Sequence, residues 1–164
     1  MEDGSIGTFP MGLGNPLKFS IHPPLQVSEH TFEEIVEKAE KAVVEGIGDH
    51  GCEYMTGGIA VILGEVGRNF GAGMSGGIAY VYDNNNKFNI RCNSEGLNLD
   101  PVSIPKDVAE LRSLIVNHYN ATQSPLAQRI LENWQSELSK FIKVLPEEYR
   151  QALIRLEKEN LVKQ

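Results

Sequence analysis

A Gly-rich apolar segment that recurs after nineteen residues is the feature that most constrains the fold of this chain. Met55-Thr-Gly-Gly-Ile-Ala-Val-Ile-Leu63 aligns with Met74-Ser-Gly-Gly-Ile-Ala-Tyr-Val-Tyr82. Each copy is a short turn followed by strand-forming residues. Repeats of about twenty residues are typical of stacked coils, in which each coil buries its apolar side against the next. The middle of the chain is therefore predicted to be a piece of β-solenoid, a scaffold rather than a catalytic unit.

Glycines are dense in this region, as tight corners between stacked strands require. The glycines predicted to form structural coil corners are Gly57, Gly58, Gly67, Gly71, Gly73, Gly76 and Gly77. Strands are predicted over 59–63 and 78–82, where β-branched and aromatic residues gather. The turn at 83–86 could return residues 87–92 as a hairpin partner.

Two patterns precede the repeat. Residues 1–30 are rich in Gly and Pro and are predicted to form an irregular arm. Residues 32–43 have apolar residues at helical spacing behind a capping box that begins at Thr31, which favours an amphipathic helix. The alternative is a strand of an earlier coil, because Ala42–Gly46 resembles Ala60–Gly64.

The last third of the chain is predicted to be helical. Pro105, Pro125 and Pro146 stand where helices begin, and Ser124 supplies an N-cap hydroxyl. A helical segment could close the open end of the coils, which would otherwise expose unpaired backbone. The predicted parts are 1–41, an arm with an amphipathic helix; 42–100, β-coils; and 101–164, a helical C-terminal segment.

Few residues could carry out chemistry. Residues 71–76 match the G-x-G-x-x-G dinucleotide fingerprint, but a strand follows them where the fingerprint needs a helix, so we expect coil corners here. The weak polar-cluster candidates are Asp49, His50, Cys52, Glu53 and Arg68. A Cys–His pair can act as nucleophile and base or bind a metal, yet this spacing fits no zinc pattern. We expect turn residues that bond locally, with Arg68 paired to Asp49 or Glu53 of the adjacent coil.

Two further residues with functional potential are expected to be structural. His118 and Trp134 both lie on apolar helical faces and are predicted to belong to the core. No Ser/His/Asp arrangement, paired-carboxylate site or phosphate loop stands out, so we predict no catalytic, cofactor-binding or metal-ligating residue.

Charge and cysteine content limit the setting. The net charge of −7 argues against binding nucleic acid or an anionic membrane by electrostatics. No apolar run approaches the ~20 residues that span a bilayer, and the N-terminus lacks a signal-peptide pattern. Cys52 and Cys92 are the only cysteines, and we expect free thiols. A cytoplasmic setting follows, or a plastid if the source is a photosynthetic eukaryote.

Several long segments resemble the C-terminal region of the glutamate synthase large subunit. They are residues 46–58, 67–81, 124–134 and 140–149. The resemblance runs from about Ala42 to about Leu153, roughly two thirds of the chain. It implies a right-handed β-helix, truncated here and followed by the helical segment.

The family's full chain makes two glutamates from glutamine and 2-oxoglutarate with a reductant. It carries a cysteine amidotransferase domain, an FMN-binding barrel and an iron–sulfur cluster, and its β-helix is a structural element without known catalytic residues. None of those catalytic parts is present in 164 residues. The resemblance therefore implies a chain that holds no cofactor, does not turn over alone, and docks on the catalytic domains of glutamate synthase.

Two other functions remain open. The chain could be a free-standing β-solenoid module that associates with partners or with itself through exposed coil ends. It could also be an enzyme that uses His50, Cys52 and Arg68 at a coil corner.

In the family, earlier coils should precede residue 42. We expect the amphipathic segment to cover the exposed first coil with Ile35, Val36 and Ala39.

Overall fold

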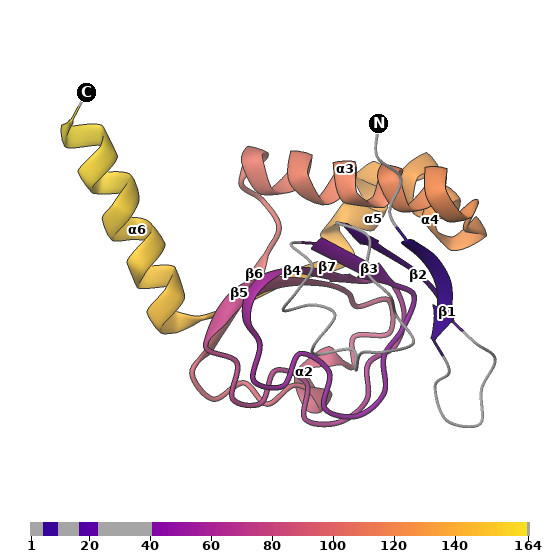
Figure 1. Cartoon of the computed structure of the whole chain (residues 1–164), viewed down its shortest axis with the longest axis horizontal. Helices are drawn as coiled ribbons and strands as arrows, with labels where there is room; N and C mark the ends of the chain where they lie inside the picture. Colours follow the sequence, from indigo (N-terminus) through magenta and orange to yellow (C-terminus); the bar gives the residue numbers. More distant parts are fainter. Residues whose placement is uncertain (1–4, 10–16, 23–40, 164) are drawn as a thin grey trace.

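The computed structural model describes residues 5–9, 17–22 and 41–163 of the chain. The elements are β1 (Ser5–Phe9), β2 (Leu17–His22), β3 (Lys41–Val44), β4 (Thr56–Ile62), β5 (Gly76–Tyr82), α2 (Phe88–Arg91), β6 (Leu97–Pro101), α3 (Pro105–Thr122), α4 (Pro125–Glu132), α5 (Trp134–Glu137), the 3-10 turn η2 (Leu138–Lys140), β7 (Phe141–Pro146) and α6 (Glu147–Val162). The described strands form one sheet in the order β1-β2-β3-β4-β5-β7-β6 (Figure 1).

The middle of the sheet is built from the repeated segments. β3, β4 and β5 run parallel, with Ala42 paired to Ala60 and Ala60 paired to Ala79. The loops between these strands stack in the same way. Their backbone hydrogen bonds include Ile47 N to Glu65 O at 2.9 Å, His50 N to Arg68 O at 2.7 Å and Gly71 N to Gly51 O at 2.8 Å. The strands predicted at 59–63 and 78–82 are confirmed to within a few residues.

The prediction of a right-handed β-helix is wrong as a fold class. A solenoid adds parallel strands in one direction, but this sheet is open and mixed: β2 pairs antiparallel with β3, and β7 pairs antiparallel with β5. The place beside β5 where another coil would lie is taken by β7, which arrives only after the helices. A segment that repeats once specifies two stacked turns, but it does not specify how the sheet continues on either side.

Residues 83–96 add a third layer to the stacked loops. Phe70 donates its backbone N–H to Arg91 O at 3.2 Å. The hairpin predicted for 87–92 is wrong, because α2 occupies this stretch. At the start of α2, the Asp83 carboxylate accepts the backbone N–H groups of Lys87 at 3.0 Å and Phe88 at 3.3 Å, which favours a helical conformation there.

Alternate side chains of the sheet enter two separate cores, because successive strand residues point to opposite faces. The loop-side core, between the sheet and the stacked loops, consists of Ala42, Val44, Ile47, Cys52, Met55, Ala60, Ile62, Val66, Phe70, Met74, Ala79, Val81, Phe88 and Val144. The helix-side core, between the sheet and the helices, consists of Val43, Val61, Leu63, Tyr80, Tyr82, Val102, Leu111, Leu114, Ile115, Ala127, Ile130 and Phe141. Figure 1 shows α3, α4 and α5 above the strands and the loops with α2 below them.

The helix starts predicted in the last third are confirmed. Pro105 begins α3, Pro125 begins α4, and α6 follows directly after Pro146. Ser124 caps α4, since its Oγ accepts the backbone N–H of Ala127 at 3.1 Å. The prediction of an all-helical segment over 101–164 is wrong at β7, which is a strand. The helices also do not close a coil end: α3 and α4 cover one face of the sheet, because their apolar stripes pack on the helix-side core.

The N-terminal arm is only partly described. β1 and β2 form an antiparallel pair at the edge of the sheet, so the prediction of an irregular arm is wrong for 5–9 and 17–22. Ala42 lies in β3, as the strand alternative expected. The rest of the predicted amphipathic helix, with Ile35, Val36 and Ala39, lies outside the described residues. Among the helices that are described, none has the length and hydropathy needed to cross a membrane.

Candidate functional site

Asp49 and Arg68 meet at the outer edge of the stacked loops. Arg68 donates its backbone N–H to Asp49 Oδ1 at 2.6 Å and its Nη2 to Oδ2 at 3.0 Å. The backbone N–H and then the guanidinium hold the pKa of Asp49 below its usual value. The predicted pairing of Arg68 with Asp49 is confirmed. Both side chains are exposed, and the contact joins one loop to the next.

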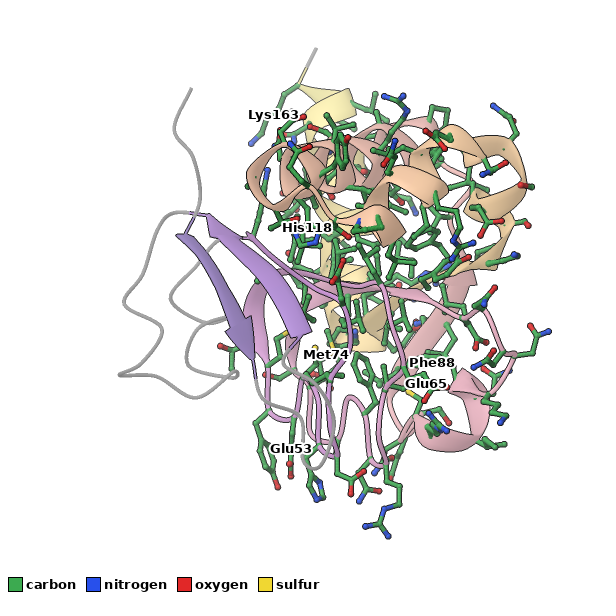
Figure 2. The ribbon with its side chains drawn as sticks, turned by 90° about the vertical axis from the view of Figure 1, so that its right-hand side faces the viewer. Glu53, Glu65, Met74, Phe88, His118 and Lys163 are labelled. Atoms are coloured by element: carbon green, nitrogen blue, oxygen red, sulfur yellow. The ribbon has the colours of Figure 1, made fainter. Side chains whose placement is uncertain are left out.

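The remaining residues of the polar cluster point in different directions. His50 Nδ1 lies 3.3 Å from Glu53 Oε2, and the His50 side chain is 54% exposed. Figure 2 shows Glu53 on the outer side of the loops. Cys52, by contrast, is 2% exposed and belongs to the loop-side core. A catalytic thiol must be accessible and ionised, so the burial of Cys52 argues against a Cys–His nucleophile at this corner.

The backbone of this corner is unusual. His50, Cys52 and Asn69 have positive φ angles of 67°, 55° and 58°. Non-glycine residues adopt this conformation only when surrounding structure holds them there. Nineteen residues after Cys52, the same position is occupied by Gly71, with φ 77°. The strain thus belongs to a turn geometry that both stacked loops repeat, and it accounts for the glycine at this position of the second loop.

The predicted coil-corner glycines have different local environments. Gly57 and Gly58 lie in β4, Gly76 and Gly77 in β5, and Gly67, Gly71 and Gly73 in the second stacked loop. At Gly67 a Cβ would collide with Asp49 and with the backbone of Gly48, so close approach of two loops requires glycine. At Gly57 a Cβ would meet no atom within 4 Å. Close packing therefore does not require glycine at Gly57.

The G-x-G-x-x-G match at 71–76 leads into β5. The pyrophosphate-binding version of this motif needs a helix N-terminus at that place, so the structure favours the interpretation as loop corners. Among the described residues, no group of three or more His, Cys, Asp or Glu side chains could hold a metal ion. Neither cysteine forms a disulfide, and burial raises the pKa of Cys92 to about 11.

A buried polar network on the helix side was not predicted. Tyr82 donates its hydroxyl to the carboxylate of Glu137, whose side chain is only 8% exposed. Lys140 Nζ lies 3.1 Å from Glu137 Oε1, and Arg129 Nη1 lies 3.8 Å from Oε2. The Tyr82 hydroxyl, followed by Lys140, keeps the pKa of Glu137 below its usual value. The signal in the sequence was weak, since Glu137 resembles any surface glutamate of a helical segment.

His118 is fully buried, as its apolar helical face predicted. Its Nε2 lies 3.7 Å from Glu45 Oε1, and Ser124 donates its hydroxyl to the same carboxylate oxygen. Figure 2 places His118 between the helices and the strands. These contacts join the end of β3 to the connection between α3 and α4, so this His118 cluster fixes the helices on the sheet.

Comparison with known proteins identifies this arrangement. Residues 33–147 match the family model described as GXGXG motif, which covers well over half of the chain. The chain belongs to the GXGXG motif family. The stacked loops and the strands β3 to β7 lie within the matched residues, whereas β1 and β2 lie outside them and α6 lies almost wholly outside them.

Relatives of this GXGXG chain are glutamate synthases. It is 55% identical to glutamate synthase [NADH] of Schizosaccharomyces pombe over 114 residues. These aligned residues make up 70% of this chain and 5% of the relative. It is 46% identical over 118 residues to the glutamate synthase [NADPH] large chain of Bacillus subtilis, covering 71% and 8%. A ferredoxin-dependent glutamate synthase of Pyropia yezoensis is 49% identical over 106 residues, covering 65% and 7%.

The resemblance to the glutamate synthase large subunit is therefore confirmed. The chain corresponds to a GXGXG segment of these proteins and spans less than a tenth of the length of each of these three relatives.

Proposed function

We propose that this GXGXG chain acts as a non-catalytic structural segment of a glutamate synthase and docks on its catalytic parts. The parent reaction would convert glutamine and 2-oxoglutarate to two glutamates with a reductant. The observation that carries the proposal is the high identity confined to 5–8% of much longer relatives. A segment this small within a large enzyme acts in the context of the remaining chain.

The internal architecture supports a mechanical role. The stacked loops are joined by backbone hydrogen bonds and by the Asp49–Arg68 ion pair, which makes them a stiff spacer. The candidate corner residues are engaged in local contacts or, for Cys52, buried in the core. This arrangement favours a scaffold over the corner enzyme that His50, Cys52 and Arg68 could have formed.

We propose that FMN and the iron–sulfur cluster are held by other parts of the parent enzyme. An iron–sulfur cluster is commonly held by about four cysteine thiolates, and this chain has two cysteines in all. We expect the chain to share the compartment of the parent enzyme, which would be the cytoplasm or, in photosynthetic eukaryotes, the plastid.

The test is reconstitution. A glutamate synthase large chain lacking the matching segment is purified with and without this chain added in trans, and flavin absorbance, complex mass and glutamate formation are measured. We expect the chain to co-purify with the flavoprotein and to raise its activity, while the chain alone forms no glutamate. A matched control adds a chain with Gly67→Ala, which should weaken the stacked loops and the complementation together.

Other outcomes would contradict the proposal in distinct ways. A colourless homo-oligomer that ignores the truncated enzyme would indicate a free-standing association module. Turnover by the chain alone, lost in folded His50→Ala or Cys52→Ala variants, would indicate a corner enzyme.

A further inference from the structure

A cavity of about 220 Å³ lies where β4 and β5 end. Its walls come from the ends of these two strands, from the turn after β5, from α2 and from α4. The carboxyl ends of adjacent parallel strands are a common place for ligands, above all where the strand order changes. β5 is one of two strands, with β3, at which this sheet changes between parallel and antiparallel pairing.

The lining combines an apolar floor with a charged rim. The apolar residues are Leu63, Val66, Val81, Phe88 and Leu126. The charged residues are Glu65, Asp83, Lys87, Arg91 and Arg129. Figure 2 labels two of these lining residues, Phe88 at the start of α2 and Glu65 near it. A largely apolar pocket with a few convergent polar groups is the usual form of a small-molecule site.

The two anionic residues of the rim are already engaged. Glu65 Oε1 accepts from Asn85 Nδ2 at 2.9 Å, and Glu65 Oε2 lies 3.8 Å from Arg91 Nη1. Asp83 Oδ1 accepts the backbone N–H groups of Lys87 and Phe88. Neither carboxylate therefore needs a ligand to complete its hydrogen bonds.

The cations are less fully engaged. Within the described part of the chain, the Lys87 ammonium forms no ion pair. Arg129 contacts the Tyr82 hydroxyl and has a long 3.8 Å contact to Glu137, and its guanidinium retains further N–H groups. Arg91 donates to Val66 O at 2.6 Å, and a guanidinium has further N–H groups. The rim of this cavity thus offers positive charge on a chain whose net charge is −7.

We propose that the cavity binds a small organic carboxylate with a compact apolar body. Lys87, at the start of α2, and Arg129, on α4, would hold the carboxylate together with Arg91, and the apolar body would lie on Val81, Phe88 and Leu126. The volume is below the roughly 300 Å³ at which drug-sized pockets begin, so the ligand is small. The apolar floor favours an organic anion over inorganic phosphate. This proposal does not depend on the proposed function.

The test uses the full 164-residue chain and benzoate as the probe, with benzyl alcohol as its neutral analogue of similar shape. Binding is followed through the backbone amide resonances of Val81, Phe88 and Leu126. We expect saturable binding of benzoate in the millimolar range, as for other ligands this small. Benzyl alcohol should bind at least about tenfold more weakly, because it lacks the charge-assisted hydrogen bonds.

Charge-removal variants locate the site. Lys87→Ala and Arg129→Ala should each weaken benzoate binding by about tenfold. Arg155→Ala removes an exposed cation on α6, outside the lining, and should leave binding unchanged. The comparison of benzoate with benzyl alcohol stands even if a variant does not fold. Equal binding of the two probes, tighter binding of phosphate than benzoate, or no saturation up to about 10 mM benzoate would each overturn the proposal.

Discussion

The two faces of the central sheet are closed by different means. On the loop side the chain itself returns in stacked turns, which are joined by backbone hydrogen bonds such as Ser75 N to Met55 O at 2.9 Å. On the helix side α3, α4 and α5 lie across the strands and are held there by side-chain pairs. Those pairs are Tyr80 with Glu110, Tyr82 with Glu137, Ser124 with Glu45, and Lys143 with Asp107.

The difference shows where each face tolerates change. Backbone ladders do not depend on side-chain identity, so the loop side is sensitive mainly to added atoms at its glycines and to loss of core volume. Side-chain pairs depend on both partners, and a buried group that loses its partner is costly. Substitutions that add atoms at a glycine or remove core volume should therefore destabilise the loop side most. Substitutions that remove a polar partner should destabilise the helix side most.

The largest effect is expected from a cavity in the loop-side core. Phe70 is fully buried and packs edge-on against Phe88 with ring centroids 5.2 Å apart. Phe70→Ala should cost about 4 kcal/mol, because the surrounding loops are fixed by backbone bonds and collapse little. Ile130→Ala, in the helix-side core on α4, should cost less, about 3 kcal/mol, since a helix can shift to fill space. Urea unfolding of both variants measures this, and a larger loss for Ile130→Ala would contradict the comparison.

The next effect separates two glycines of the repeat. Gly67→Ala places a methyl group against Asp49 and the backbone of Gly48, and should cost about 3 kcal/mol through separation of the loops. Gly57→Ala is the matched control, because its Cβ would meet open space and its φ is not positive. Thermal unfolding midpoints of the two variants should differ clearly. Similar midpoints would mean that the stacked loops accommodate the added methyl group, which would contradict the prediction.

The buried carboxylate of the helix side should make stability depend on pH. The pKa of Glu137 is lower in the folded chain than in the unfolded one. Its contribution is therefore present above the ordinary carboxyl pKa and is lost as pH falls through the folded value. Glu137→Gln should cost about 1.5 kcal/mol at neutral pH and flatten the acid side of the stability profile. Glu159→Gln, on exposed α6, is the control. An unchanged acid profile in Glu137→Gln would contradict the assignment.

The smallest effect concerns the helix cap. Ser124→Ala removes the acceptor for Ala127 N and the donor to Glu45, and should cost about 1 kcal/mol. Ser136→Ala, which removes a hydroxyl exposed on α5, should change the free energy of unfolding little. Equal losses in the two variants would show that the α3–α4 connection is not anchored through Ser124.

Local features were predictable from the residues alone. The period of nineteen placed β4 and β5 in register, since both copies present the same turn and the same apolar alternation. Ser124 and the three prolines placed the starts of α3, α4 and α6, because caps and first-turn prolines act within one helical turn. The Asp49–Arg68 pair followed from stacking one turn on the next.

The long-range arrangement was not predictable in the same way. β7 reads as part of a helical segment, yet it lies beside β5 because its apolar residues complete both cores at once. Glu137 and the cavity at the strand ends join residues more than fifty positions apart, and no local spacing marks them.

The sequence by itself determined the repeated turns, the helix caps and the family. Each of these depends on residues within one turn or one repeat of each other, or on identity along the chain. Only the tertiary structure decided that the sheet is mixed, that helices cover a face rather than an end, and that cations gather at the cavity rim. Those features depend on which distant strand pairs with β5. β7 takes this place because it helps to bury both faces of the sheet at the same time.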